Sequence, residues 1–307
     1  MKLSIVSPVY KAAQILPELV RRINETFEGL GIDYEIVLVD DRSPDDSWEV
    51  LKLLASDNQN IKAFRLSRNF GQHYAITAGI SKASGDLIIV MDCDLQDNPA
   101  FIPELIRKHA EGYNVVCTIK QQKEYSWYRR ITSDMFFFVV NRLSDVKLEK
   151  NLGTMTLIDR RVADEYIKIR DYHRHSSMIF AWLGFNRGYV NVVQEQRFEG
   201  RSSYTLRNLI HHAINGVISQ SDRLLRLSIT FGMIMFTIAL LGAGYIVVRS
   251  FFHHFEVGWP SLVVLILFTT SIILLMLGIA GLYIGKTFEQ VKERPLFIIA
   301  EEAASRE

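Results

Sequence analysis

The 307-residue chain has no excess of charge of either sign, because 35 Lys and Arg residues are balanced by 34 Asp and Glu residues. A net charge of +1 provides no broad positive field, which argues against a nucleic-acid partner. The only two cysteines, Cys93 and Cys117, lie in or beside runs that are expected to be buried strands. We interpret them as core side chains in a reducing compartment, which excludes a disulfide framework and a cysteine metal site.

The sequence also contains neither a G-x-G-x-x-G motif nor a Walker A motif, which excludes the usual dinucleotide site and the P-loop. Instead, strand and helix signals alternate along the first 200 residues or so. This alternation predicts an α/β fold with a mostly parallel sheet that is covered by helices on both faces. The expected strands are 3–7, 34–39, 62–66, 87–91 and 115–119, and the expected helices are 15–28, 47–55, 72–83 and 100–111.

Two carboxylates follow the apolar run 87–91 directly, in the order Asp92-Cys93-Asp94. Side chains at positions i and i+2 of an extended segment point the same way, so both carboxylates can hold one divalent cation. Mg²⁺ and Mn²⁺ prefer such oxygen ligands and can in turn bind a diphosphate. Ligands of parallel sheets bind outside the carboxyl ends of the strands, where Asp40 and Asp41 are also expected. The two carboxylates can also be loop caps, and this pair alone does not decide between the two interpretations.

Two long segments without charged residues, 227–248 and 261–285, are each long enough to cross a bilayer. The short connection between them predicts a hairpin. Basic residues precede the first segment and follow the second, so the positive-inside rule places both ends in the cytoplasm. We therefore expect a multi-pass protein of the inner (cytoplasmic) membrane. Its expected parts are a cytoplasmic catalytic domain 1–204, an interfacial amphipathic helix 205–226, a transmembrane hairpin 227–285 and a cytoplasmic tail 286–307. A further amphipathic helix at 126–143 belongs either to the core or to the membrane interface.

Five motifs follow one another along the chain ahead of the hairpin. They are Pro8-Val9-Tyr10, Asp40-Asp41-Arg42-Ser43-Pro44-Asp45, Arg68-Asn69-Phe70-Gly71-Gln72, Asp92-Cys93-Asp94-Leu95-Gln96 and Arg197-Phe198-Glu199-Gly200-Arg201-Ser202-Ser203-Tyr204. In this order and spacing, together with the hairpin, the chain resembles the family-2 inverting glycosyltransferases with a GT-A fold. Within them it is similar to the polyprenyl-phosphate branch, which includes dolichol-phosphate mannose synthases, bactoprenol (O-antigen) glucosyl transferases and the aminoarabinose transferase of lipid A modification.

The resemblance implies a metal-dependent transfer of one sugar, with inversion, from a nucleotide-diphosphate sugar to a polyprenyl phosphate such as undecaprenyl phosphate. The product would be a lipid-linked monosaccharide for cell-envelope glycan or lipopolysaccharide modification. A UDP-sugar is the favoured donor, Mg²⁺ or Mn²⁺ the cofactor, and a homo-oligomer, for example a tetramer, the expected assembly.

The resemblance also assigns site residues, and the four arginines among them can instead anchor the chain at the membrane surface. The implied metal ligands are Asp92, Asp94 and Gln96. The implied nucleotide and diphosphate pocket consists of Pro8, Tyr10, Asp40, Asp41, Asp92, Gln96, Arg130, Ser203 and Tyr204, and the implied catalytic residues are Asp94, Arg129, Arg197 and Arg201.

The chain departs from the family pattern at several positions. Lys11 and Ala12 replace Asn-Glu, and Thr154 and Thr156 stand where a carboxylate and an arginine are usual. Asp97, Asp159 and His175 are candidates to compensate for this loss. Two alternative functions stay open. The chain can be a processive polysaccharide synthase, because residues 194–198 nearly match the Gln-x-x-Arg-Trp signature of that class. It can also be a membrane scaffold that has lost catalytic activity.

Overall fold

The computed structural model describes residues 1–120, 141–142, 149, 151–172, 174–193, 223–250 and 258–304. The chain divides into two compact units, which are treated separately below. The first contains residues 1–137, 146–204 and 294–307, and the second contains residues 138–145 and 205–293.

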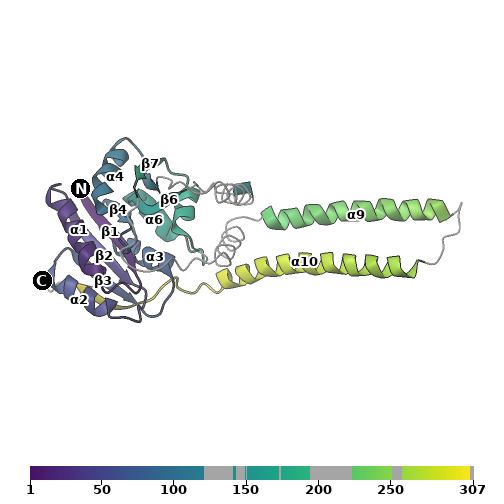
Figure 1. Cartoon of the computed structure of the whole chain (residues 1–307), viewed down its shortest axis with the longest axis horizontal. Helices are drawn as coiled ribbons and strands as arrows, with labels where there is room; N and C mark the ends of the chain where they lie inside the picture. The colour runs from purple at the N-terminus through teal and green to yellow at the C-terminus, as the bar shows by residue number, and fades with distance from the viewer. Residues whose placement is uncertain are drawn as a thin grey trace. The chain divides into compact units, whose positions relative to one another are not determined.

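The first unit is built on an eight-stranded mixed sheet, coloured purple to teal in Figure 1 apart from its last strand. Four neighbouring strands run parallel in the order β4-β1-β2-β3, with helices in the connections. This arrangement confirms the α/β fold and the strand and helix positions expected in the first 120 residues. The bounds are β1 (Lys2–Val9), α1 (Leu16–Glu28), β2 (Asp33–Asp40), α2 (Ser47–Asp57), β3 (Ile61–Leu66), α3 (Gln72–Lys82), β4 (Leu87–Val90), the short 3₁₀ helix η1 (Pro99–Phe101), α4 (Ile102–Ala110) and β5 (Val115–Lys120).

The second half of the sheet is mixed, because β6 inserts between β4 and β5 and runs antiparallel to both. At one sheet edge β7 pairs parallel with β5, and at the other edge β8 pairs antiparallel with β3. The bounds of these elements are β6 (Leu152–Asp159), α6 (Arg160–Lys168), α7 (Ser176–Trp182), β7 (Arg187–Val192) and β8 (Ile299–Ala304).

Strand alternation divides the buried apolar side chains between two cores, one on each face of the sheet. In β2, Ile36 and Leu38 belong to the core that also contains buried side chains of α1, α2 and α4. Val37 and Val39 belong to the core that contains side chains of α3, α6 and α7. Helices therefore cover both faces, as the near-continuous apolar strands predict.

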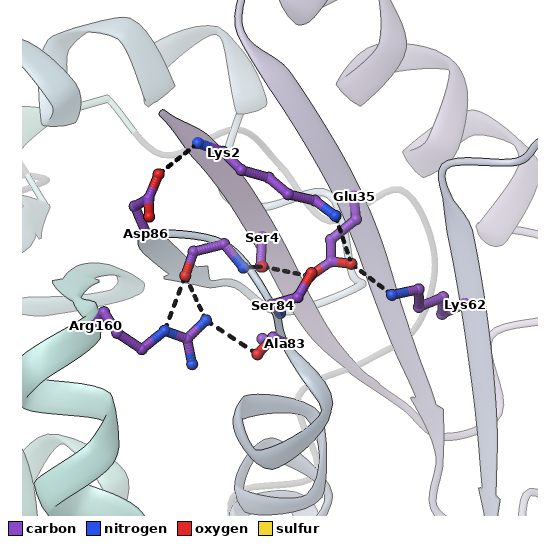
Figure 2. Close-up of polar contacts among 9 residues, drawn as sticks. Lys2, Ser4, Glu35, Lys62, Ala83, Ser84, Asp86 and Arg160 are labelled. Atoms are coloured by element: carbon purple, nitrogen blue, oxygen red, sulfur yellow. Dashed lines mark hydrogen bonds and ion pairs between the residues drawn. The ribbon is translucent and has the colours of Figure 1, made fainter.

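One carboxylate, Glu35 of β2, lies near the amino ends of the parallel strands among several polar partners (Figure 2). It is buried, with only 2% of the residue exposed. Its oxygens accept hydrogen bonds from Ser4 Oγ at 2.6 Å, from Ser84 N at 2.5 Å and from Lys62 Nζ at 2.8 Å. Burial by itself raises the pKa of Glu35, but these hydrogen bonds reverse the shift and lower it to about 2. Glu35 thereby joins β1, β2, β3 and the end of α3 through one charged group.

The C-terminal segment, expected to be a tail, instead adds strand β8 to the edge of the sheet next to β3. Glu301 accepts a hydrogen bond from Trp48 Nε1 at 3.1 Å and pairs with Arg65 at 3.2 Å. Glu302 pairs with Lys82 at 2.9 Å. The chain therefore returns to the sheet of the first unit after its last helix.

The second unit contains two long helices, α9 (Arg223–Ser250) and α10 (Trp259–Val291), drawn in green to yellow in Figure 1. Each contains a stretch that is long and apolar enough to cross a membrane, at Leu225–Gly242 and Phe268–Val291. Large apolar side chains of both helices, including Leu241 and Ile284, are exposed. The two helices include the segments 227–248 and 261–285 expected to form the hairpin. The expected amphipathic helices at 126–143 and 205–226 lie mostly outside the described residues.

Candidate active site

The four parallel strands bring their carboxyl ends, and the motifs that follow them, to one edge of the sheet. The connection after each strand turns through a residue with positive φ: Lys11 (φ 55°), Arg42 (φ 55°), Gly71 (φ 109°) and Leu95 (φ 58°). Glycine adopts this conformation freely, but other residues rarely do, and those that do gather at functional sites. The strained backbone at Lys11, Arg42 and Leu95 therefore points to this edge, as the sequence motifs do.

A first cavity of about 420 Å³, here called the strand-end cavity, lies at this edge. Tyr10 is 46% exposed, so its ring is accessible to a planar ligand. Cys93 is half-buried, and burial raises the pKa of its thiol to about 12. The lining residues are Pro8, Val9, Tyr10, Asp41, Asn69, Gly71, Gln72, Asp92, Cys93 and Asp94.

The adjacent carboxylates Asp40 and Asp41 have different surroundings. Asp40 is fully buried, accepts a hydrogen bond from Ser43 N at 2.9 Å and lies 3.2 Å from Arg65 Nε. It is not among the residues that line the strand-end cavity. Asp41 lines the cavity, and its oxygens accept the backbone N–H groups of residues 70 and 71 at 2.7 and 2.8 Å. Asp41 thus fixes the loop before α3, and a binding role for Asp40 stays a prediction.

The two carboxylates behind β4 both line the strand-end cavity, as the sequence predicts. Gln72 Nε2 donates a hydrogen bond of 2.6 Å to Asp92 Oδ1. Burial raises the pKa of Asp92 to about 7, and the negative charges of Asp94 and Asp97 add to this rise, opposed by Lys120 and Gln72. A bound cation would relieve this repulsion, and carboxylate oxygens are the ligands that Mg²⁺ and Mn²⁺ prefer. The donor set therefore fits a divalent metal.

Gln96 contributes a backbone contact, in which its N–H donates to Asp94 Oδ1 at 3.1 Å. Its side chain is not among those that line the strand-end cavity, so its role as a metal ligand stays a prediction. Within the described part of the chain, no group of three or more His, Cys, Asp and Glu residues is placed to hold a metal. The role of Asp92 and Asp94 as metal ligands therefore stays a prediction, which their shared place in the strand-end cavity permits.

A second cavity of about 460 Å³, here called the β6 cavity, shares Gln72 and Asp92 with the strand-end cavity. Its wall contains three residues noted above for their departure from the family pattern or as candidates to compensate for it, namely Thr154, Thr156 and His175. The full lining is Gln72, His73, Ile76, Val90, Asp92, Glu149, Asn151, Leu152, Gly153, Thr154, Thr156, His175, Ser176, Ser177 and Phe180.

The three candidates for compensation have different positions. Asp97 is buried, accepts a hydrogen bond from the Thr154 hydroxyl, and has its pKa raised by burial. Asp159 caps α6 by accepting a hydrogen bond from Val162 N at 2.8 Å, and it lines neither cavity. His175 lines the β6 cavity directly. Of the three, His175 is therefore the one that lines either of these two cavities.

Sequence reasoning did not single out Lys120, whose charge opposes the rise in the pKa of both Asp92 and Asp97. The rule that ligands meet strand ends also applies to β5, of which Lys120 is the last residue, and would have identified it. Asn151 and His73 in the β6 cavity were missed as well, and no local motif marks either.

Six predicted site residues fall outside the described residues, and their proposed roles stay predictions. They are Arg129, Arg130, Arg197, Arg201, Ser203 and Tyr204.

Comparison with known proteins agrees with the architecture. Residues 4–167 match glycosyl transferase family 2. An uncharacterized glycosyltransferase of Synechocystis sp. is 34% identical over 98% of this chain and 95% of its own length. A bactoprenol glucosyl transferase of Shigella phage SfII is 32% identical over 97% of each chain. Among solved structures, the chain is similar to mannosyl-3-phosphoglycerate synthase from Rubrobacter xylanophilus, with a TM-score of 0.50 and 17% identity over 71% of this chain and 73% of that one. This similarity confirms the GT-A-like fold. The chain belongs to glycosyl transferase family 2.

Proposed function

We propose that this glycosyltransferase moves one sugar from a nucleotide-diphosphate sugar to a polyprenyl phosphate. The observation that carries the proposal is the pair Asp92 and Asp94 in a strand-end cavity that adjoins a second cavity, in a chain with two apolar helices. The full-length similarity to a bactoprenol glucosyl transferase supports this choice of acceptor.

The strand-end cavity has the chemistry for a nucleoside diphosphate. The exposed ring of Tyr10 offers a stacking surface for a base. Asp92 and Asp94 are the residues that would hold Mg²⁺ or Mn²⁺, and the bound ion would neutralise negative charge on the leaving diphosphate. Gln72 orients the Asp92 carboxylate through its 2.6 Å hydrogen bond, so that the group is positioned before the donor binds.

The transfer itself needs no strong general base. The second pKa of a phosphate monoester is about 6, so the acceptor is largely a dianion at neutral pH. One phosphate oxygen forms the new bond to the anomeric carbon while the bond to the nucleotide diphosphate breaks, and the electron pair leaves with the diphosphate. Attack opposite the leaving group inverts the anomeric centre. The contribution of this chain is to hold both reactants in line.

The two apolar helices would anchor the chain to the membrane in which a lipid acceptor lies. Basic residues flank the pair, with Arg226 in the first turn of α9 and Lys286, Lys292 and Arg294 at the end of α10 or beyond it. The chain then returns to the sheet as β8, as expected when the paired helices cross the membrane twice. By the positive-inside rule the catalytic unit lies on the cytoplasmic side of the inner membrane. Holding a membrane-bound phosphate beside the site replaces a rare encounter by a local one.

A transfer assay with the full-length protein tests the proposal. Purified enzyme in detergent is given UDP-[¹⁴C]glucose, Mg²⁺ or Mn²⁺ and undecaprenyl phosphate, and label in the lipid phase is counted. We expect lipid-phase label with wild type and at least a hundredfold less with Asp94→Asn. Glu104→Gln, at a half-buried position on α4 that lines neither cavity, is the matched control and should keep full activity. Equal transfer by Asp94→Asn and wild type would contradict the proposal.

A further inference from the structure

The C-terminal strand β8 brings a carboxylate to the end of β3, next to the turn that follows β2. Glu301 of β8 stands opposite Arg65 in the antiparallel register with β3. One of its oxygens lies 3.2 Å from Arg65 Nη1 and 3.8 Å from Arg42 Nη1, and the other accepts a hydrogen bond from Trp48 Nε1 at 3.1 Å. These partners belong to β3, to the turn after β2 and to α2, so a single side chain of β8 joins three parts of the sheet domain.

Arg65 carries this contact inward to a carboxylate that has no exposed surface. Its Nε lies 3.2 Å from Asp40 Oδ2, and its guanidinium stands 5.7 Å from the centre of the Trp48 ring. A buried carboxylate requires a fixed cation, because an unpaired charge in the interior is costly. The rigid fork of an arginine can contact two carboxylates at once. Glu301 therefore holds the outer side of the guanidinium while its inner side stays on Asp40.

Asp40 in turn connects to the wall of the strand-end cavity. Its Oδ1 accepts a hydrogen bond from Ser43 N at 2.9 Å, and Ser43 Oγ accepts one from Lys11 N at 3.1 Å. Lys11 directly follows Tyr10, whose exposed ring lines the cavity. A continuous path of polar contacts therefore runs from β8 to the part of the wall that offers a stacking surface.

Two turns along this path have a strained backbone, because Lys11 and Arg42 both have φ of 55°. Such a conformation persists only where the surrounding contacts hold it. Glu301 acts on the turn at Arg42 directly and on the turn at Lys11 through the path described above. The direct pair is about half exposed and contributes little, so the contact with Arg65 carries most of the effect.

The residues just before β8 support a second loop at the same edge of the sheet. Ser67 N donates a hydrogen bond of 2.9 Å to the carbonyl of Ile298. Ser67 begins the loop after β3, which contributes Asn69 and Gly71 to the lining of the strand-end cavity. The segment that follows α10 thus contacts both the turn after β2 and the loop after β3. A wall held in this way is arranged before a ligand binds, which lowers the cost of binding.

We propose that Glu301 is a positioning residue that shapes the wall at Tyr10 and Asp41, through Arg65 and Asp40, for the nucleotide of the donor. The inference rests on the proposed function for the assignment of a nucleotide to this cavity. Glu301 is not among the residues that line the cavity, so its effect on binding is indirect.

The next residue, Glu302, provides a matched control. It also belongs to β8 and also forms an ion pair, with Lys82 Nζ at 2.9 Å. Lys82 is the last residue of α3, whereas Gln72, at the first position of that helix, lines the strand-end cavity. Removing Glu302 therefore breaks an ion pair of the same strand without touching the path to the cavity.

Nucleotide binding by the full-length protein in detergent tests the inference. Calorimetry with Mg²⁺ and without lipid gives the Kd of UDP and of GDP for wild type, Glu301→Ala, Glu301→Gln and Glu302→Ala. The comparison uses the nucleotide that wild type binds more tightly. Backbone hydrogen exchange of residues 40–46 is measured on the same four proteins without nucleotide, and urea unfolding checks that each is folded.

Glu301→Ala should raise the Kd about fivefold, the size expected for one hydrogen bond, and should speed hydrogen exchange at residues 40–46. Glu301→Gln keeps an acceptor for Trp48 Nε1, so its Kd should lie between those of wild type and Glu301→Ala. Glu302→Ala should match wild type in both measurements. If Glu301→Ala does not fold, Glu301→Gln takes its place, with an expected rise of about threefold.

Kinetics separate positioning from a general loss of structure. In the transfer assay, the KM for UDP-glucose should rise in Glu301→Ala by the same factor as the Kd, while kcat and the KM for undecaprenyl phosphate keep their wild-type values. A Kd equal to that of wild type would overturn the inference, and so would an equal rise in Glu302→Ala.

The same measurements distinguish this inference from the proposed function. If nucleotide binding depends on Glu301 but label never reaches undecaprenyl phosphate, the acceptor assignment fails and the inference stands. If transfer occurs and nucleotide binding is independent of Glu301, the inference fails alone. Binding of neither nucleotide by wild type would contradict both.

Discussion

Replacing Glu35 by Gln should cost the fold about 3 kcal/mol at neutral pH. The hydrogen bonds of the buried carboxylate lower its pKa from 4.5 to about 2, and each unit is worth 1.36 kcal/mol of preference for the charged form. Because only 2% of the residue is exposed, solvent screens this interaction little. Gln keeps the shape of the side chain but leaves the ammonium groups of Lys62 and Lys2 without their carboxylate partner.

The pH dependence of this stabilisation has a definite sign. The pKa of Glu35 is depressed in the folded state, so its contribution is complete above the unfolded pKa of 4.5 and is lost as the pH falls toward about 2. From these two values the contribution should fall from about 3 kcal/mol at pH 7 to about 1.5 kcal/mol at pH 3. The stability difference between wild type and Glu35→Gln should narrow by the same amount.

Urea unfolding of the full-length protein in detergent, followed by tryptophan fluorescence at pH 7 and pH 3, measures this difference. Glu302→Gln, which removes an exposed ion pair with Lys82, is the control and should change stability by less than about 1 kcal/mol. Equal stability of Glu35→Gln and wild type at pH 7 would refute the reasoning. A difference that does not change between pH 7 and pH 3 would refute it as well.

Two further predictions use the same unfolding measurement. Gly79→Ala should destabilise the fold by about 1–3 kcal/mol, because the new Cβ would lie 2.3 Å from Val6 Cγ1 where α3 meets β1. Gly29→Ala is the control, because open space surrounds Gly29, and it should not destabilise the fold. Equal effects of the two substitutions would contradict the packing argument. Thr154→Val should lower the free energy of unfolding by about 1–3 kcal/mol, because it leaves the buried Asp97 carboxyl without its hydroxyl donor. An unchanged unfolding midpoint would show that this hydrogen bond does not stabilise the fold.

The parallel part of the sheet could be predicted because its strands are nearly continuous apolar runs separated by helical patterns. Strand β8 could not, since its sequence Ile-Ala-Glu-Glu-Ala-Ala is poor in residues that favour strands. It forms because it pairs with the edge of β3 and because Glu301 and Glu302 find basic partners there. Such tertiary stabilisation leaves no local pattern in the sequence.

The candidate site could likewise be predicted only in part from the sequence. The Asp92 and Asp94 pair could be located from its place behind an apolar strand. Which of Asp40 and Asp41 reaches the cavity depends on the course of the chain just after β2, which strand periodicity does not specify. The contact between His73 and His175 joins residues about a hundred positions apart, so it follows only from the packing of α7 against α3.

The most direct test of the central claim is the mass of the lipid product. Full-length enzyme is incubated with UDP-glucose, Mg²⁺ and undecaprenyl phosphate, and the lipid fraction is analysed by mass spectrometry. We predict one new species, heavier than undecaprenyl phosphate by a single hexose residue and dependent on Asp94. A ladder of longer glycans, or unchanged undecaprenyl phosphate with every nucleotide sugar supplied, would contradict the assignment as a polyprenyl-phosphate glycosyltransferase.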